Sequence, residues 1–162
     1  MGWPFKIFAV YPTPFWRDAG LNGFVTALTP SDIVNGVFDN SQPSGKPGVL
    51  FVLMEGASAR KWAPRPVAER KAAILQRLAD FFGPKALEPI GYREQDWAAD
   101  PWIRGGSSVS IPPGTWTEYG HTLRPPIGRI HWTETETSVQ FWGSLDGAIS
   151  AGERAAREVL AA

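Results

Sequence analysis

The sequence has 162 residues with equal numbers of basic and acidic side chains, 16 of each, so its formal net charge is +0. This length predicts about one domain, and the balanced charge gives no indication of nucleic acid or an anionic membrane as a partner. Cysteine is absent, which excludes disulfides and thiolate chemistry, and with no signal peptide and no apolar run of roughly 20 residues we expect a cytoplasmic protein.

Four short runs in the first third of the chain favour β-strands. They are rich in β-branched and aromatic residues and are separated by turn-forming segments such as 40–48; the runs are 6–11, 24–28, 33–38 and 49–54. Successive strands joined by turns predict an antiparallel sheet. Residues 49–53 do not alternate between apolar and polar, so we expect both faces of that strand to be covered.

The apolar period becomes helical from Val67 onward. Ile74, Leu78 and Phe82 recur at helical spacing until Gly83 and Pro84 end the run. A loop region rich in Trp and Pro is predicted for 92–120, and a short strand for 127–132.

A terminal helix is predicted next, with one apolar stripe made of Leu145, Ile149, Ala156 and Leu160. The order of strands, helix, loop, strand and helix indicates an α+β fold.

Few of the familiar catalytic motifs are present. His121 and His131 have no metal-ligand spacing around them, and Glu134 and Glu136 are explained as well by a solvated strand end as by acid catalysis. The sequence has no GxSxG elbow, no GxGxxG loop after a strand and no Walker loop. It therefore has no phosphate-binding loop of its own.

A pattern spread over the whole chain carries more information. It comprises Lys6 with Pro14-Phe15-Trp16, Trp97, Gly105-Gly106, Pro112-Pro113-Gly114, residues 129–137 and residues 142–156. Together these residues resemble the C-terminal portion of the flavin-dependent amine oxidases of the monoamine oxidase type. The resemblance leaves the N-terminal dinucleotide-binding βαβ unit outside this sequence.

The resemblance implies a chemistry. In this family a hydride passes from the carbon next to an amine to FAD, giving an imine, and oxygen regenerates the flavin with hydrogen peroxide as product. We expect FAD to bind only together with the missing half. Gly106 falls where monoamine oxidases have the cysteine that links FAD covalently, so we expect non-covalent binding.

Two catalytic residues are implied by the resemblance, Lys6 and Trp97. Lys6 matches a lysine that holds a water against the flavin and assists the reaction with oxygen, and Trp97 matches a tryptophan near the flavin. A cation is reasonable there because reoxidation passes negative charge to oxygen. By itself, a lysine at the start of a strand is usually a solvated charge.

The implied cofactor-binding residues cluster around the start of the terminal helix and the preceding loop. A helix N-terminus carries about half a positive charge and unpaired N–H groups, which suits the electron-rich edge of a reduced flavin. A glycine-containing helix start packed on a sheet is the alternative explanation. The residues are Gly105, Gly106, Thr135, Gly143, Ser144 and Leu145.

Departures from the family pattern concern the substrate and the cofactor. Ser107 and Ser144 replace the two tyrosines that flank the amine, which leaves a wider and more polar space that Trp142 or Trp102 can partly fill. We therefore expect Ser107, Ser144 and Trp142 to bind substrate, with preference for a larger or polar amine. Glu134 replaces a glycine and places a side chain beside the cofactor.

The predicted organisation is a substrate-binding domain segment at 1–104 and the closing segment of an FAD-binding domain at 105–162. A non-enzymatic scaffold, or a subunit that functions with a separate chain carrying the nucleotide-binding half, is the first alternative. A small-ligand module with a Trp-lined cavity is the second, weaker one. Exposed apolar surface is expected to favour self-association.

Overall fold

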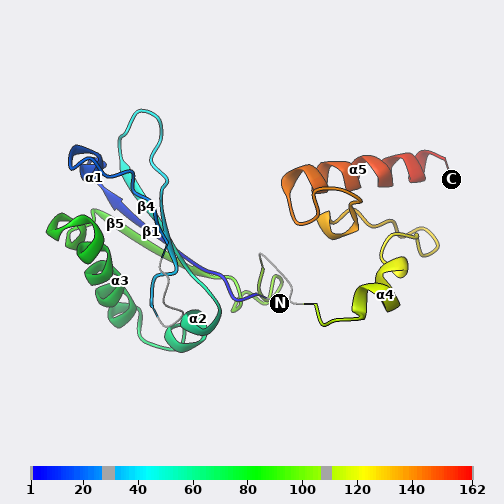
Figure 1. Ribbon diagram of the computed structural model, residues 1–162, viewed down its shortest axis with the longest axis horizontal. Helices are drawn as coiled ribbons and strands as arrows, with labels where there is room; N and C mark the ends of the chain where they lie inside the picture. The colour runs from blue at the N-terminus through cyan, green and yellow to red at the C-terminus, as the bar shows by residue number, and fades with distance from the viewer. Residues whose placement is uncertain (1, 27–31, 107–110, 162) are drawn as a thin grey trace. The chain divides into compact units, whose positions relative to one another are not determined.

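The computed structural model describes residues 2–26, 32–106 and 111–161. Contacts divide the chain into two compact units, unit 1 from Met1–Ser107 and unit 2 from Ser108–Ala162. Figure 1 shows that strands belong to unit 1, whereas the described part of unit 2 consists of helices and loops. The functional assignment of residues 1–104 and 105–162 stays a prediction.

Unit 1 is built on a five-stranded sheet in the order β2-β3-β4-β1-β5. Every pair is antiparallel, and the strands are β1 (Phe5–Tyr11), β2 (Val25–Thr26), β3 (Gly36–Asp39), β4 (Gly48–Met54) and β5 (Gly91–Asp96). The four runs predicted as strands are confirmed, although β3 begins later than expected; residues 27 and 28 lie outside the described residues. The α+β fold is confirmed.

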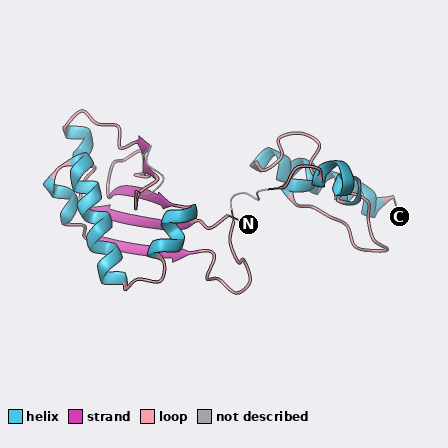
Figure 2. Ribbon diagram, turned by 60° about the horizontal axis from the view of Figure 1, so that its bottom comes forward, coloured by secondary structure: helices cyan, strands magenta, loops and turns pink. Residues whose placement is uncertain are grey.

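Helices α2 (Gly56–Trp62) and α3 (Val67–Phe82) lie on the same face of this sheet (Figure 2). Strands β1 and β4 alternate strictly between buried and half-buried residues. The buried side chains of the sheet join Ile74 and Leu78 of α3 in one hydrophobic core. The core therefore lies between the sheet and the helices. Burying each side chain of this size there contributes about 1.5–3 kcal/mol to folding.

Helix α3 occupies the predicted residues. Pro66 precedes its first residue, and Gly83 follows its last with φ 89, a backbone conformation that glycine adopts without steric cost. The shorter helices α1 (Phe15–Asp18) and η1 (Pro84–Leu87) complete the unit. Trp16 of α1 is fully buried, and its indole N–H donates to Asp39 at 2.9 Å.

The loop predicted at 92–120 is wrong at two places. Residues Gly91–Asp96 form β5, and residues Thr115–Tyr119 form the short helix α4. The β5 sequence is polar and lacks apolar alternation, so periodicity could not reveal it. It is a strand because its backbone pairs with β1, from Phe5↔Asp96 to Val10↔Gly91.

Unit 1 does not by itself supply the cover that we expect on both faces of β4. Val49, Phe51 and Leu53 are only half-buried, while the residues between them are buried. Among the described residues of unit 1, helices cover only the face to which the buried residues point. The other face, called here the open face, also carries Lys6 and Phe8 of β1.

Unit 2 contains the predicted terminal helix as α5 (Leu145–Leu160), together with α4, η2 (Gly120–Thr122) and η3 (Thr135–Thr137). The predicted apolar stripe is wrong, because the buried residues of α5 are Gly147, Ala151 and Ala155. Leu145, Ile149, Ala156 and Leu160 are exposed. Small residues allow the preceding loop to approach the helix closely, and they determine which side is buried.

No strand forms at 127–132, contrary to prediction. The only pairing there is an isolated bridge between Ile127 and Ile130. A strand needs a neighbouring strand for its backbone hydrogen bonds, and unit 2 offers none among residues 111–161.

Candidate functional site

Lys6 is the second residue of β1, the strand between β4 and β5 in the sheet. Its cross-strand neighbours are Leu53 of β4 and Gln95 of β5. The residues on either side of it, Phe5 and Ile7, are buried in the core, so the Lys6 side chain lies on the open face. Its Nζ lies 5.9 Å from the centroid of the Phe51 ring.

A row of aromatic rings crosses the open face beside Lys6. Phe8 and Phe51 lie 5.3 Å apart between centroids, Phe51 and Phe38 5.8 Å, and Phe38 and Phe24 5.3 Å. Sequence reasoning missed this row. The period of two in β1 and β4 places Phe8 and Phe51 on the same face as Lys6, but only the register shows that they are neighbours.

Trp97 follows β5 directly and is held through its backbone. Its N–H donates to Pro4 at 3.3 Å, and its carbonyl accepts from Gly105 at 2.8 Å. The carboxylate of Asp96 fixes this turn by accepting from Trp3 Nε1 at 3.0 Å and from the N–H of Ala98 at 2.9 Å. The indole Nε1 of Trp97 is buried without a hydrogen-bond partner among the described residues.

Gly105 and Gly106 return the chain to the start of β1. Gly105 is buried with φ 128, and the N–H of Gly106 donates to Gly2 at 3.3 Å. A Cβ on Gly106 would meet Pro4 at an ordinary 3.6 Å. The structure thus brings Lys6, Trp97, Gly105 and Gly106 together around one end of β1. Ser107 lies outside the described residues, and its role stays a prediction.

In unit 2, Thr135, Gly143, Ser144 and Leu145 meet at the start of α5. The hydroxyl of Thr135 donates to the carbonyl of Ser144 at 2.9 Å. Ser144 is the N-cap, since its hydroxyl accepts from the N–H of Gly147 at 3.1 Å and donates to the carbonyl of Phe141. Gly143 has φ 76, and Leu145 is 86% exposed. Four predicted cofactor residues are therefore neighbours.

Gly147, in the first turn of α5, was not singled out from the sequence. A Cβ there would lie 2.3 Å from the carbonyl oxygen of Phe141 and 2.7 Å from Thr135 Oγ1. Only glycine permits this approach of the loop to the helix. The arrangement of Thr135 and Ser144 depends on it.

Trp142 and Glu134 flank this cluster. The Trp142 indole donates to the carbonyl of Glu136 at 3.1 Å, and its ring meets Trp116 edge-on at 5.9 Å. Trp142 remains 42% exposed, and the side chain of Glu134 is exposed as well. Trp102 is 93% exposed in unit 1.

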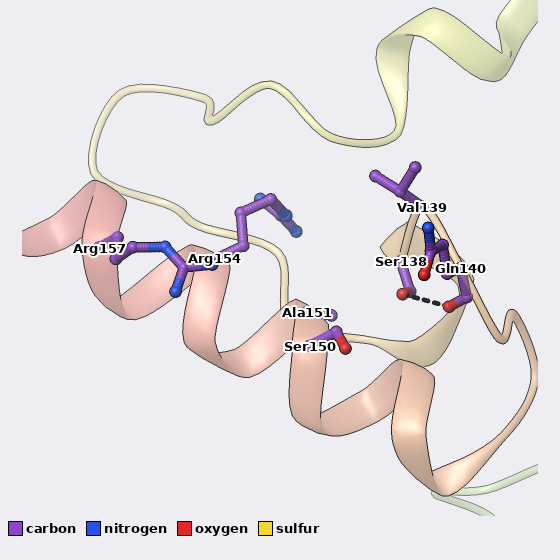
Figure 3. A pocket seen from close by; sticks show the side chains of 7 residues that line it. All are labelled: Ser138, Val139, Gln140, Ser150, Ala151, Arg154 and Arg157. Carbon is purple, nitrogen blue, oxygen red and sulfur yellow. Dashed lines mark hydrogen bonds between the residues drawn. The ribbon is translucent and has the colours of Figure 1, made fainter.

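A cavity of about 260 Å³ lies in unit 2 beside α5 (Figure 3). Arg154 uses its guanidinium to donate to the carbonyl of Trp132 at 2.7 Å and to Thr137 Oγ1 at 3.0 Å. It also pairs with Glu158, so its role is to tie α5 to the preceding loop. No predicted site residue lines the cavity, which is formed by Ser138, Val139, Gln140, Ser150, Ala151, Arg154 and Arg157.

Glu158 connects α5 to the segment that was predicted as a strand. His131 Nδ1 lies 3.0 Å from one oxygen of its carboxylate. The hydrogen bond with His131, and then the one from Arg154, hold the pKa of Glu158 below its usual value. This contact anchors the 131–137 segment.

Within residues 2–26, 32–106 and 111–161, no three His, Cys, Asp or Glu side chains gather as metal ligands. Across those ranges no helix has both the length and the hydropathy to cross a bilayer.

Comparison with known proteins gives a consistent result. The family model for flavin containing amine oxidoreductase matches residues 1–160. The chain is 41% identical over 156 residues to a Mycobacterium tuberculosis protein provisionally named as a flavin-containing monoamine oxidase, covering 96% of this chain and 33% of the relative. It is 39% identical over 160 residues to an L-amino acid dehydrogenase of Synechocystis, covering 99% of this chain and 34% of the relative.

A solved structure extends the likeness to three dimensions. Putrescine oxidase bound to putrescine matches with a TM-score of 0.88 and 36% identity, over 98% of this chain and 35% of that chain. The chain thus spans about a third of the length of the relatives that it matches. By this match over nearly its whole length, the chain belongs to the flavin containing amine oxidoreductase family.

Proposed function

We propose that this chain is the C-terminal portion of an FAD-dependent amine oxidase, which converts an amine to an imine and passes the electrons to oxygen as hydrogen peroxide. The observation that carries the proposal is the family match over residues 1–160. In this proposal residues 1–104 belong to the substrate-binding domain. Residues 105–162 close the FAD-binding domain.

Several residues suit a flavin. Trp97 offers a buried, unpartnered N–H donor, and such a group needs a partner to offset its desolvation. The start of α5, with Thr135 and Ser144 beside it, supplies a helix N-terminus that favours negative charge. Glu134 is the exception, since it adds a negative charge next to Thr135. When bound, FAD accepts the hydride and returns the electrons to oxygen.

Lys6 and Trp97 are assigned separate tasks. The Lys6 ammonium stabilises negative charge on oxygen during reoxidation, because a fixed cation in a partly dry site lowers the energy of a developing anion. Trp97 is assigned as a wall of the site, with its backbone held by Pro4 and Gly105. Both side chains come from the same end of one sheet.

A larger or polar amine is the proposed substrate class. Ser107 and Ser144 stand where the resemblance implies tyrosines, and Trp142 is assigned to the same wall. The Ser144 hydroxyl is engaged in capping α5, so its contribution is the space left by a missing ring. Relatives named as an L-amino acid dehydrogenase and as putrescine oxidase are consistent with this class, while a relative named as a monoamine oxidase leaves simple arylalkylamines as the alternative.

The rival function is a non-enzymatic scaffold or a subunit completed by a separate chain. It applies if no other segment supplies the glycine-rich phosphate loop that these residues lack, since the pyrophosphate of FAD is usually bound at a helix N-terminus behind such a loop. The completed subunit differs from the first proposal only in where the nucleotide-binding half is encoded.

A flavin-retention experiment tests the proposal. The purified chain is mixed with FAD, desalted and scanned for flavin absorbance, alone and after co-expression with the nucleotide-binding segment of a putrescine oxidase. We expect the chain alone to be colourless and the complex to be yellow, with flavin released by acid because Gly106 offers no thioether. The complex should produce peroxide with a polyamine or an amino acid.

Two outcomes would contradict the proposal. A chain that alone retains stoichiometric flavin would show that the missing half is not required. A folded complex that stays colourless would favour the scaffold.

A further inference from the structure

Lys6 has an aromatic neighbour, Phe51, that the sequence motifs alone do not indicate. Phe51 stands directly opposite Phe8 in the β1–β4 register, two residues from Leu53, the partner of Lys6. Diagonal neighbours on one face of a sheet are within reach of long side chains. The Nζ of Lys6 lies 5.9 Å from the centroid of the Phe51 ring, within the range of a cation–π contact.

The orientation of the Phe51 ring is fixed by the rings beside it. Phe8 of β1 and Phe38 of β3 both neighbour it, in offset arrangements with interplanar angles of 28° and 27° and centroid distances of 5.3 and 5.8 Å. Turning Phe51 would disrupt both stacks at once. The surface presented to Lys6 is therefore set by the sheet register.

In the part of the chain that the structure describes, no competing partner holds the ammonium. Among the described residues, no hydrogen bond or ion pair to Lys6 is found, and its neighbour Gln95 donates to the carbonyl of Asp96 at 3.4 Å. A carboxylate partner would occupy N–H donors and offset the charge. A ring holds the ammonium through its π face and leaves all three N–H donors available.

We propose that Phe51 is a positioning residue that holds the Lys6 ammonium over its ring, charged and with its donors unused, for the reaction with oxygen. The inference rests on the proposed function for the role of Lys6, but the contact itself can be tested without flavin. The role assigned to Phe51 is to act through Lys6, whose ammonium it holds.

The contact is tested on the chain as it is, by reductive ¹³C-methylation of its lysines and NMR of the dimethylamino signals. The Lys6 signal is identified by its loss in Lys6→Arg. We expect it to be displaced upfield by the ring current of Phe51, to return to the position of solvated lysines in Phe51→Leu, and to remain displaced in Phe51→Tyr. Lys71, which lies 5.4 Å from the Tyr92 ring, is the matched control and should not move.

A Lys6 signal that coincides with solvated lysines, or that does not respond to Phe51→Leu, would overturn the proposal. Because Phe51→Tyr keeps the ring, its spectrum separates loss of the contact from loss of the fold. Unchanged Lys71 and circular dichroism signals provide the same check for Phe51→Leu.

The functional consequence is measured in the flavin-loaded complex. We expect Phe51→Leu to slow reoxidation by oxygen about 2- to 5-fold, leave anaerobic flavin reduction unchanged, and add nothing when Lys6 is already Met. If Lys6→Met alone alters neither half-reaction, the proposed function of Lys6 fails. If Lys6→Met slows reoxidation and Phe51→Leu does not, the positioning role fails while the proposed function stands.

Discussion

Units 1 and 2 are stabilised in different ways. Of the 20 buried hydrophobic residues in the described parts of the chain, 18 belong to unit 1, and unit 2 contributes only Ala151 and Ala155. Unit 1 therefore has a hydrophobic core of its own between sheet and helices. Unit 2 is held mainly by hydrogen bonds from Arg124, Arg154 and the Ser144 cap.

The apolar side chains of unit 2 are present but exposed. Trp116, Tyr119, Phe141, Leu145 and Ile149 are between 46% and 86% exposed. Exposed apolar area of this kind commonly marks an interface. We therefore expect unit 1 to fold on its own contacts, and unit 2 to gain stability from a partner that covers this apolar area.

Two leucines should show the largest difference between the units. Leu78 in α3 is fully buried and Leu145 in α5 is 86% exposed. Leu78→Ala should lower the free energy of unfolding by about 2–5 kcal/mol, because it leaves a cavity in the core. Leu145→Ala should change it by less than about 0.5 kcal/mol in the isolated chain. Urea denaturation followed by tryptophan fluorescence measures both.

The same pair also has a converse test. In a complex of this chain with the nucleotide-binding half, Leu145→Ala should weaken the binding of the two parts. Leu78→Ala should instead lower the free energy of unfolding of unit 1. Equal unfolding effects of the two substitutions in the isolated chain would show that the units do not differ as described.

Within unit 1, we expect a substitution on the open face of the sheet to change activity but not stability. Lys6 lies on the open face and has no hydrogen-bond partner in the described residues. Lys6→Met should leave the unfolding midpoint nearly unchanged, yet slow reoxidation of a flavin-loaded complex by a factor of roughly 100, equivalent to about 3 kcal/mol. Stopped-flow kinetics measures the rates of flavin reduction by substrate and of reoxidation by oxygen. An equal loss of rate in both half-reactions would indicate that Lys6 has a structural role.

Unit 2 offers a matched pair of glycines in α5. A Cβ at Gly147 would lie 2.3 Å from the carbonyl oxygen of Phe141, whereas one at Gly152 would meet nothing within 4 Å. Gly147→Ala should destabilise unit 2 by about 1–3 kcal/mol through overpacking. Gly152→Ala should increase helicity, worth up to about 1 kcal/mol. Far-UV circular dichroism during thermal unfolding measures both, and a helix gain at both positions would disprove the close approach.

The elements that were predicted from sequence are those in which the local pattern matches the final environment. Helix α3 was predicted because its apolar period agrees with the face it buries. Strand β5 was missed because its polar sequence is recruited by pairing with β1. The open face of β4 was missed because an unbroken apolar run does not reveal which side a helix will cover.

The candidate site shows the same limit. The resemblance assigns Lys6, Trp97 and Thr135, but no sequence pattern indicates that the Lys6 ammonium lies over the Phe51 ring or that the Phe141 carbonyl lies against Gly147. Both depend on distances between segments far apart in the chain. Register and close approach are tertiary properties, and a single sequence does not encode them in its local periods.

The smallest expected effect concerns the anchor between α5 and His131. Because hydrogen bonds with His131 and Arg154 lower the pKa of Glu158 in the folded chain, the stabilisation is complete above the unfolded pKa of glutamate, about 4.3, and is lost as pH falls through the folded value. Far-UV circular dichroism between pH 7 and pH 3 should therefore show a small loss of α5 helicity, and Glu158→Gln should reduce it. Glu153→Gln is the control, because Glu153 lies 3.8 Å from Arg157 and 64% of its side chain is exposed. An equal response from the two variants would show that the His131 contact contributes nothing beyond an ordinary surface ion pair.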